Sequence, residues 1–95
     1  MTTDVEREAA RKAKDLLSSL TLSTPPADEI IFALQEAASL ATEGSLEASS
    51  EAAPNYVRAA TALRAVSGQL HQRSLAQEML DRAKQAVEAW VNALQ

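Results

Sequence analysis

Side chains able to do covalent or metal chemistry are sparse in this 95-residue sequence. It contains no cysteine, which removes thiolate nucleophiles, disulfides and cysteine-based metal sites. His71 is the only histidine, and Gly68 stands three positions before it, where carboxylate-bridged di-iron bundles have a glutamate. We therefore expect no metal and no cofactor, with His71 solvated at a helix C-terminus.

Nucleophilic catalysis has no better support in the residue pattern. The serines fall on expected helix faces or in a polar segment, without a Gly-x-Ser-x-Gly elbow or a phosphate-binding glycine loop. Glu47 and Glu51 share a helical face, but no basic or metal-binding side chain accompanies them. The sequence therefore predicts a non-enzymatic protein with no catalytic residues and no small-molecule substrate.

The composition instead indicates closely packed helices. Hydrophobic residues make up 46% of the chain, yet twenty of them are alanine, and there is one Trp, one Tyr and one Phe. Each buried alanine methyl contributes only about 0.8 kcal/mol, so a monomer should be modestly stable and would gain from sharing a surface with a second chain. We expect residues 1–95 to form one helical domain.

Apolar side chains recur at three- and four-residue spacing in four stretches, which predicts an all-α fold. In the second stretch they cover an arc wider than about 100°, so this helix should be covered by more than one neighbour. The stripes predicted for the first and third helices are Val5, Ala9, Ala13, Leu16 and Leu20, and Tyr56, Ala59, Ala60, Leu63, Val66 and Leu70. The expected architecture is an up-down four-helix bundle. Capping-box spacing of Thr3 and Glu6, the Thr24-Pro25 start signal and Gly44 as a stop signal define the first two helices. The segment 44–53, rich in Ser, Ala and Glu, is expected to be a linker before Pro54. The predicted helices span residues 4–20, 25–43, 54–71 and 75–94.

No proline or glycine separates the last two stretches. In one unbroken helix their apolar arcs would point roughly 165° apart, so they could not enter the same core. This predicts a break around Gln72 to Ser74, with Ser74 and Gln77 at capping-box spacing. The alternative is a merged helix, of which one half serves the core and the other half a partner chain.

The charges divide into blocks along the chain. All ionisable residues between Asp28 and Ala53 are acidic, whereas those from Pro54 to Arg73 are arginines and His71. One interpretation is that opposite charges help two neighbouring antiparallel helices to pair, each exposed pair being worth less than about 1 kcal/mol. The other interpretation is a bipolar surface that docks a charged partner.

Phe32 is the residue most indicative of a binding surface. On a helical wheel it lies in the polar arc of its helix, so it faces water unless the first helix, Leu22 or Leu46 covers it. If it is uncovered, it could anchor a partner, because a large aromatic side chain that leaves water can dominate an interface. The candidate partner-binding residues are Phe32, Met79, Val87 and Val91. Trp90 and Tyr56, by contrast, are expected in the core.

The stretch from Asn55 to Trp90 resembles the helical hairpins of tetratricopeptide repeats and of the microtubule-interacting-and-trafficking domain. The similar residues are Tyr56-Val57-Arg58-Ala59 and Leu80-Asp81-Arg82-Ala83-Lys84, and the resemblance covers less than half of the chain. It implies a mode of action in which a groove between helices accepts an amphipathic peptide helix.

We therefore expect a protein–protein interaction module that binds another protein or itself as a homodimer, through exposed apolar helix faces. The net charge of -4 disfavours nucleic acid, and no apolar run is long enough to cross a membrane. The absence of a signal-like N-terminus favours a cytoplasmic location. The alternative is a small DNA-associated regulatory protein that uses Arg7, Arg11 and Lys14, which share one side of the first helix.

Overall fold

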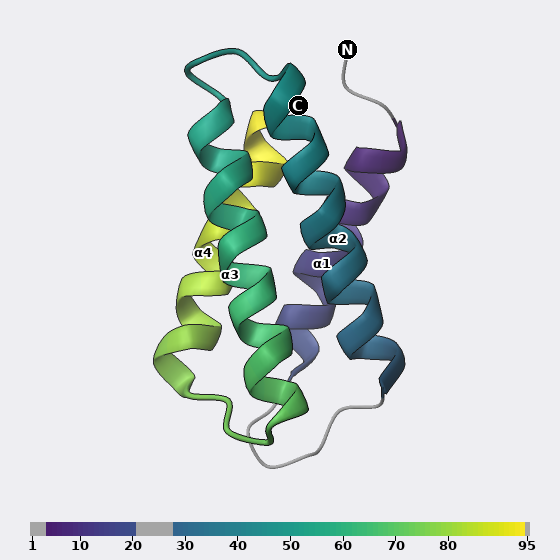
Figure 1. The fold of residues 1–95 in the computed structure, drawn as a ribbon, viewed down its shortest axis with the longest axis vertical. Helices are drawn as coiled ribbons and strands as arrows, with labels where there is room; N and C mark the ends of the chain where they lie inside the picture. The colour runs from purple at the N-terminus through teal and green to yellow at the C-terminus, as the bar shows by residue number, and fades with distance from the viewer. Residues whose placement is uncertain (1–3, 21–27, 95) are drawn as a thin grey trace.

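The computed structural model describes residues 4–20 and 28–94, and all regular secondary structure in this part of the chain is helical. Figure 1 shows the four helices lying side by side along the long axis of the molecule. No strand occurs among the described residues. The helices are α1 (Asp4–Ser19), α2 (Asp28–Glu47), α3 (Ala53–His71) and α4 (Gln77–Ala93).

Each helix packs against two others. The helix pairs with neighbouring backbones are α1 with α2, α2 with α3, α3 with α4, and α4 with α1, whereas the described Cα atoms of diagonally opposite helices lie more than 8 Å apart. The radius of gyration is 12.4 Å, which is the value expected for a compact chain of this length. This closed ring of four contacts explains why each helix buries a broad arc rather than a narrow stripe.

One hydrophobic core runs through the centre of this ring. All six residues of the apolar stripe predicted from Tyr56 to Leu70 are buried, and Trp90 is fully inaccessible. The broad arc predicted for the second helix is also confirmed, because α2 is covered by both α1 and α3. The largest fully buried apolar side chains are Trp90, Leu17, Leu34, Leu63, Leu80, Val66 and Val87.

The buried face of α1 differs from the prediction. Ala13 and Leu20 of the expected stripe are buried as predicted, and Ala9 and Leu16 are half-buried. Val5 is instead 61% exposed, and the buried face also includes Ala10 and Leu17. α1 packs against both α2 and α4, so its inward direction is turned by about 60° from the predicted one, which is less than one residue. The Thr3 capping position lies outside the described residues, and so does the predicted start of the second helix at Pro25.

Gly44 was predicted to end the second helix. In the structure it instead lies buried inside α2. A methyl group built on its Cα would lie 2.7 Å from Cε2 of Tyr56 and 2.9 Å from Oε1 of Glu6. The absent side chain therefore allows the Tyr56 ring of α3 to approach the backbone of α2. α2 continues to Glu47, which reduces the predicted linker to residues 48–52.

The break between the last two predicted helices is confirmed at residues 72–76. Arg73 has φ 58°, in the left-handed region. The N–H of Ser74 donates to the carbonyl of Gln69 at 2.8 Å, and the N–H of Arg73 donates to that of Leu70 at 3.1 Å. This pair of bonds is a Schellman motif, which ends a helix by satisfying its last carbonyls. Glycine usually occupies the left-handed position of this motif. Because this chain has arginine there, the residue type gave no sign that the helix ends at this point.

The predicted capping box of Ser74 and Gln77 does not form. The residue at the N-cap of α4 is Ala76, in extended conformation and without a side-chain cap. The side chain of Gln69 accepts the N–H of Ala76 at 3.0 Å instead. The extended backbone allows Leu75 to pack against the core before the helix starts, which displaces the helix start from Leu75 to Gln77.

Two glycine-to-alanine substitutions should change stability in opposite directions. Gly44→Ala should lower the free energy of unfolding by about 1–3 kcal/mol, because the new methyl overlaps the Tyr56 ring. Gly68→Ala should raise it by about 0.5–1 kcal/mol, since nothing lies within 4 Å of the added carbon and alanine favours helix. Urea denaturation of both variants measures this. A stabilised Gly44→Ala protein would contradict the close approach.

Arg73→Gly should raise the free energy of unfolding by up to about 1 kcal/mol, because glycine adopts the left-handed conformation without the penalty of a Cβ. The control is Gln72→Gly, at a neighbouring position with φ −87°, where glycine should be neutral or destabilising. Thermal unfolding monitored by circular dichroism compares the two. Equal effects at both positions would show that the backbone of Arg73 carries no strain.

Candidate functional site

A groove between α3 and α4 has a volume of about 480 Å³. Its floor contains alanines from both helices, whose small side chains leave room above the core. Val57 and Met79 add larger apolar surface, and the only charged residues along it are Arg58 and Arg82. The floor alanines are Ala62, Ala65, Ala86 and Ala89.

The sequence predictions did not identify these alanines. They occur in pairs at three-residue spacing, Ala62 with Ala65 and Ala86 with Ala89, beside the core stripes of their helices. That spacing was the available signal, since it places two small residues on one helical face. Only the packing of α3 against α4 brings the two pairs together into one surface.

The four candidate partner-binding residues are divided between surface and core. Phe32 is 68% exposed on α2, and Met79 is half-buried in the groove between α3 and α4. Val87 is fully buried and Val91 is 8% exposed. The expectation that these two valines face a partner is therefore corrected: α4 contacts both α3 and α1, and this arc of α4 is used inside the bundle.

Phe32 is uncovered in the described structure. Leu46, one of the residues that could have covered it, is itself 84% exposed, whereas Leu22 lies outside the described residues. The surrounding outward positions of α2 carry Glu29, Gln35 and Glu36, all exposed. A large aromatic side chain therefore stands on an acidic, solvated helix face.

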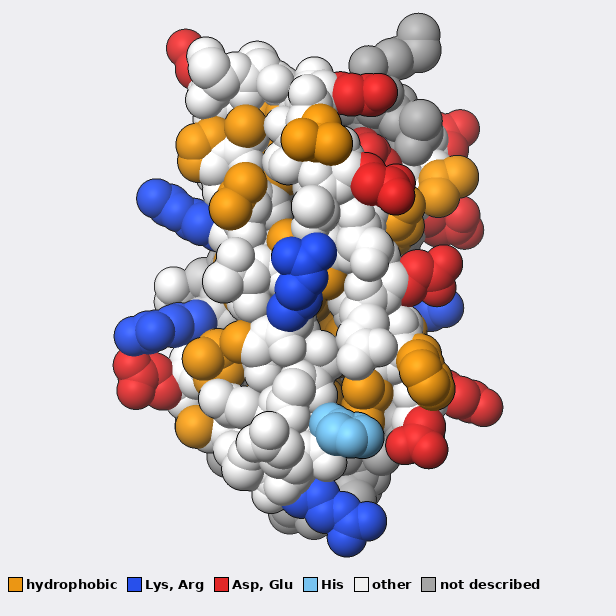
Figure 2. Space-filling model, in the orientation of Figure 1, with side chains coloured by type: hydrophobic (Ala, Val, Ile, Leu, Met, Phe, Trp, Pro, Cys, Tyr) orange, Lys and Arg blue, Asp and Glu red, His pale blue; other side chains and the backbone are white. Residues whose placement is uncertain are grey.

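The acidic and basic blocks lie on adjacent helices but do not form ion pairs with each other. Among the described residues, the direct side-chain bond between α2 and α3 runs from Nη2 of Arg64 to Oγ1 of Thr42, at 2.7 Å. Figure 2 shows most of the acidic side chains gathered on the side of α2, with arginine and lysine over α3 and on the side of α4. The two blocks thus remain exposed to solvent and to any partner.

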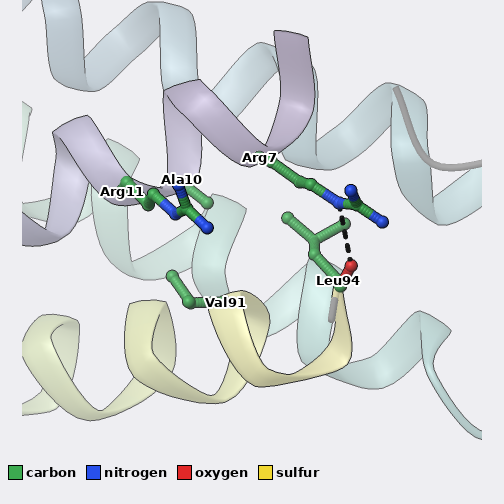
Figure 3. A pocket seen from close by; sticks show the side chains of 5 residues that line it. All are labelled: Arg7, Ala10, Arg11, Val91 and Leu94. Carbon is green, nitrogen blue, oxygen red and sulfur yellow. Dashed lines mark hydrogen bonds between the residues drawn. The ribbon is translucent and has the colours of Figure 1, made fainter. Parts of the chain in front are cut away.

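The basic residues of the first helix are partly engaged in holding the bundle together. Nε of Arg7 donates to the carbonyl of Leu94 at 3.2 Å. Figure 3 shows Arg7 and Arg11 extending from α1 beside Val91 and Leu94 of α4, around a pocket of about 300 Å³. Lys14 does not line this pocket. Two of the three basic residues therefore meet at one surface, and Arg7 also ties α1 to the end of α4.

Metal-ligating side chains do not cluster in the part of the chain that the structure describes. His71 is exposed at the C-terminus of α3, as predicted. No group of three or more His, Cys, Asp or Glu residues is placed to hold a metal ion in residues 4–20 and 28–94. None of the described helices is both long and apolar enough to cross a membrane.

Known proteins do not assign a role to this arrangement. No protein-family model matches the chain, and no curated protein and no solved structure matches it either. The groove and the exposed aromatic residue therefore have to be interpreted from their own chemistry.

The environment of Glu6 shifts the pKa of its carboxyl group. Burial raises the pKa of the Glu6 carboxyl, and the nearby carboxylates of Glu47 and Glu43 raise it further. A carboxyl with a raised pKa in the folded state binds its proton more tightly there than in the unfolded chain. Its charged form therefore opposes folding.

This raised pKa predicts a sign for the pH dependence of stability. From the ordinary glutamate pKa up to the pKa in the folded state, the unfolded chain holds fewer protons, so the free energy of unfolding should fall as pH rises. Glu6→Gln removes this contribution and should flatten that part of the profile. Urea denaturation across pH tests it, with Glu8→Gln on the exposed side of α1 as control. A Glu6→Gln profile parallel to that of the parent would contradict it.

Proposed function

We propose that this chain is a non-enzymatic protein–protein interaction module, and that it binds an amphipathic helix in the groove between α3 and α4. The observation that carries the proposal is the lining of the groove: an apolar floor of alanines, with arginine as its only charged residue type. Helix-in-groove recognition requires such an apolar surface, and charges at the edge select and orient the partner.

The dimensions of the groove support a short helical ligand. Along α3 the lining extends from Val57 to Ala65, and along α4 from Met79 to Ala89. At 1.5 Å per residue these stretches are about 12 and 15 Å long, which corresponds to two or three helical turns of a partner. Because Arg58 and Arg82 flank the floor, the preferred partner has one apolar face bordered by carboxylates.

The architecture that we propose for this module is the up-down bundle, in which consecutive helices run antiparallel. The observation in its favour is that helices adjacent in sequence are also in contact, as short connections require. A DNA-associated role is less well supported. The bond from Arg7 to Leu94 occupies part of its basic patch, and the whole chain has a net charge of -4. Retention on duplex DNA at low ionic strength would favour that alternative.

A synthetic peptide tests the proposed groove. The probe is a fluorescent alanine-based helix of about three turns, with one phenylalanine bordered by glutamates one turn before and after it. Arg58→Glu should weaken binding at least about fivefold, equivalent to about 1 kcal/mol, because the new carboxylate repels those of the peptide. Fluorescence anisotropy measures the affinity.

Lys14→Glu is the matched control, since it makes the same change of charge on α1, away from the groove. It should leave binding unchanged, and a peptide with lysines in place of glutamates should bind more weakly to the parent protein. Equal losses for Arg58→Glu and Lys14→Glu would show that overall charge, rather than the groove, controls binding. No binding of the acidic peptide to the parent would overturn the proposal.

A further inference from the structure

We infer that the helix accepted by the groove between α3 and α4 is α2 of a second copy of this chain, docked through its outer face around Phe32. This inference rests on the proposed groove function and names its partner. Phe32 is 68% exposed, and it is the only phenylalanine in the sequence. A large aromatic residue in a chain with few of them would leave water on docking, which is the behaviour of an interface anchor.

The outer face of α2 has the charge that the groove requires. Residues 28–47 contain five carboxylates and no lysine or arginine. Glu29 and Glu36 lie about one turn before and after Phe32, and both are exposed. The apolar anchor is thus bordered by negative charge on its own helix face.

The groove offers the complementary surface. Its alanine floor leaves a depression that an aromatic ring can occupy, and no acidic residue lines it. Arg82 forms an exposed ion pair with Glu78 at 2.9 Å, whereas Arg58 has no ion-pair partner among the described residues. Arg58 is therefore available to the carboxylates that border Phe32.

The length of the groove also predicts which part of α2 docks. Leu46 lies fourteen residues beyond Phe32, which is about 21 Å along a helix. The lining of the groove extends only about 12 to 15 Å. With Phe32 at the centre of the groove, Leu46 lies outside it, although both side chains are exposed on the same helix.

The surface that docks differs from the surface that receives it. Such a contact is heterologous, so each copy retains one free groove and one free α2 face, and association can continue beyond the dimer. A contact of this size belongs to the weak class of interfaces, so the average mass should rise gradually with protein concentration. High salt should reduce association by screening the charges.

Sedimentation equilibrium of the full chain across concentration tests the inference. Phe32→Ala should weaken self-association at least about tenfold, as loss of a central aromatic anchor does. Leu46→Ala, which removes a similarly exposed apolar side chain from the same helix, should not change it. A parent chain that stays monomeric up to about millimolar concentration, or equal effects of the two variants, would overturn the inference.

Complementation establishes the heterologous geometry. The Phe32→Ala chain keeps an intact groove, and the Arg58→Glu, Arg82→Glu double variant keeps an intact α2 face. Each should self-associate at least about tenfold more weakly than the parent, whereas their mixture should form a one-to-one dimer that cannot extend. Circular dichroism confirms that both variants are folded. If the mixture stays monomeric although the parent associates, α2 does not enter the groove.

These results separate the inference from the function on which it rests. If the parent is monomeric but binds the acidic peptide, the groove is a docking site for a different protein, and only the inference of a second copy fails. If neither self-association nor peptide binding occurs, the groove function itself fails.

Discussion

The close approach of the Tyr56 ring to the backbone of α2 at Gly44 links all four helices at one end of the bundle. A methyl at Gly44 would overlap both the ring of Tyr56 from α3 and the carboxylate of Glu6 from α1. The same ring lies 6.5 Å from that of Trp90 in α4, at an angle of 58°, within the range of favourable tilted aromatic pairs. One absent side chain therefore determines how near α2 and α3 can lie, and with them the position of Trp90.

This arrangement has costs. The indole N–H of Trp90 is buried, and no hydrogen-bond acceptor from residues 4–20 or 28–94 reaches it. Glu6 is placed beside other carboxylates where burial disfavours its charge. Aromatic packing around Gly44 must outweigh both, because an unpaired buried donor alone costs about 1–3 kcal/mol. Modest stability is also expected because the chain is rich in alanine, and small side chains remove little apolar area from water.

Small residues have a different consequence on the outside of the bundle. Between α2 and α3, Gly44 permits contact with the ring of Tyr56. Between α3 and α4, the outward-facing alanines line an open groove. The groove is bordered by Arg58 and Arg82, and the exposed Phe32 is bordered by Glu29 and Glu36, so the charges around the two surfaces are complementary. Both proposals rest on this complementarity.

Much of the helical architecture could be predicted because periodicity depends on local geometry. The stripe from Tyr56 to Leu70 identified the buried face of α3 correctly, and the mismatch of apolar arcs located the break before α4. Residue-type signals were less reliable. Gly44 was expected to stop a helix but lies inside α2, and the arginine at position 73 did not indicate the left-handed conformation that it adopts. Residue preferences do not report which neighbour approaches or which backbone bonds form.

The sequence by itself determined four amphipathic helices, the acidic character of α2 and the outward direction of Phe32, because each follows from residue identity and a turn of 3.6 residues. Only the tertiary structure decided that Val87 belongs to the core, that Gly44 receives an aromatic ring, and that two pairs of alanines form one groove. Each of these depends on which helices become neighbours, and that is fixed by packing between segments distant in sequence.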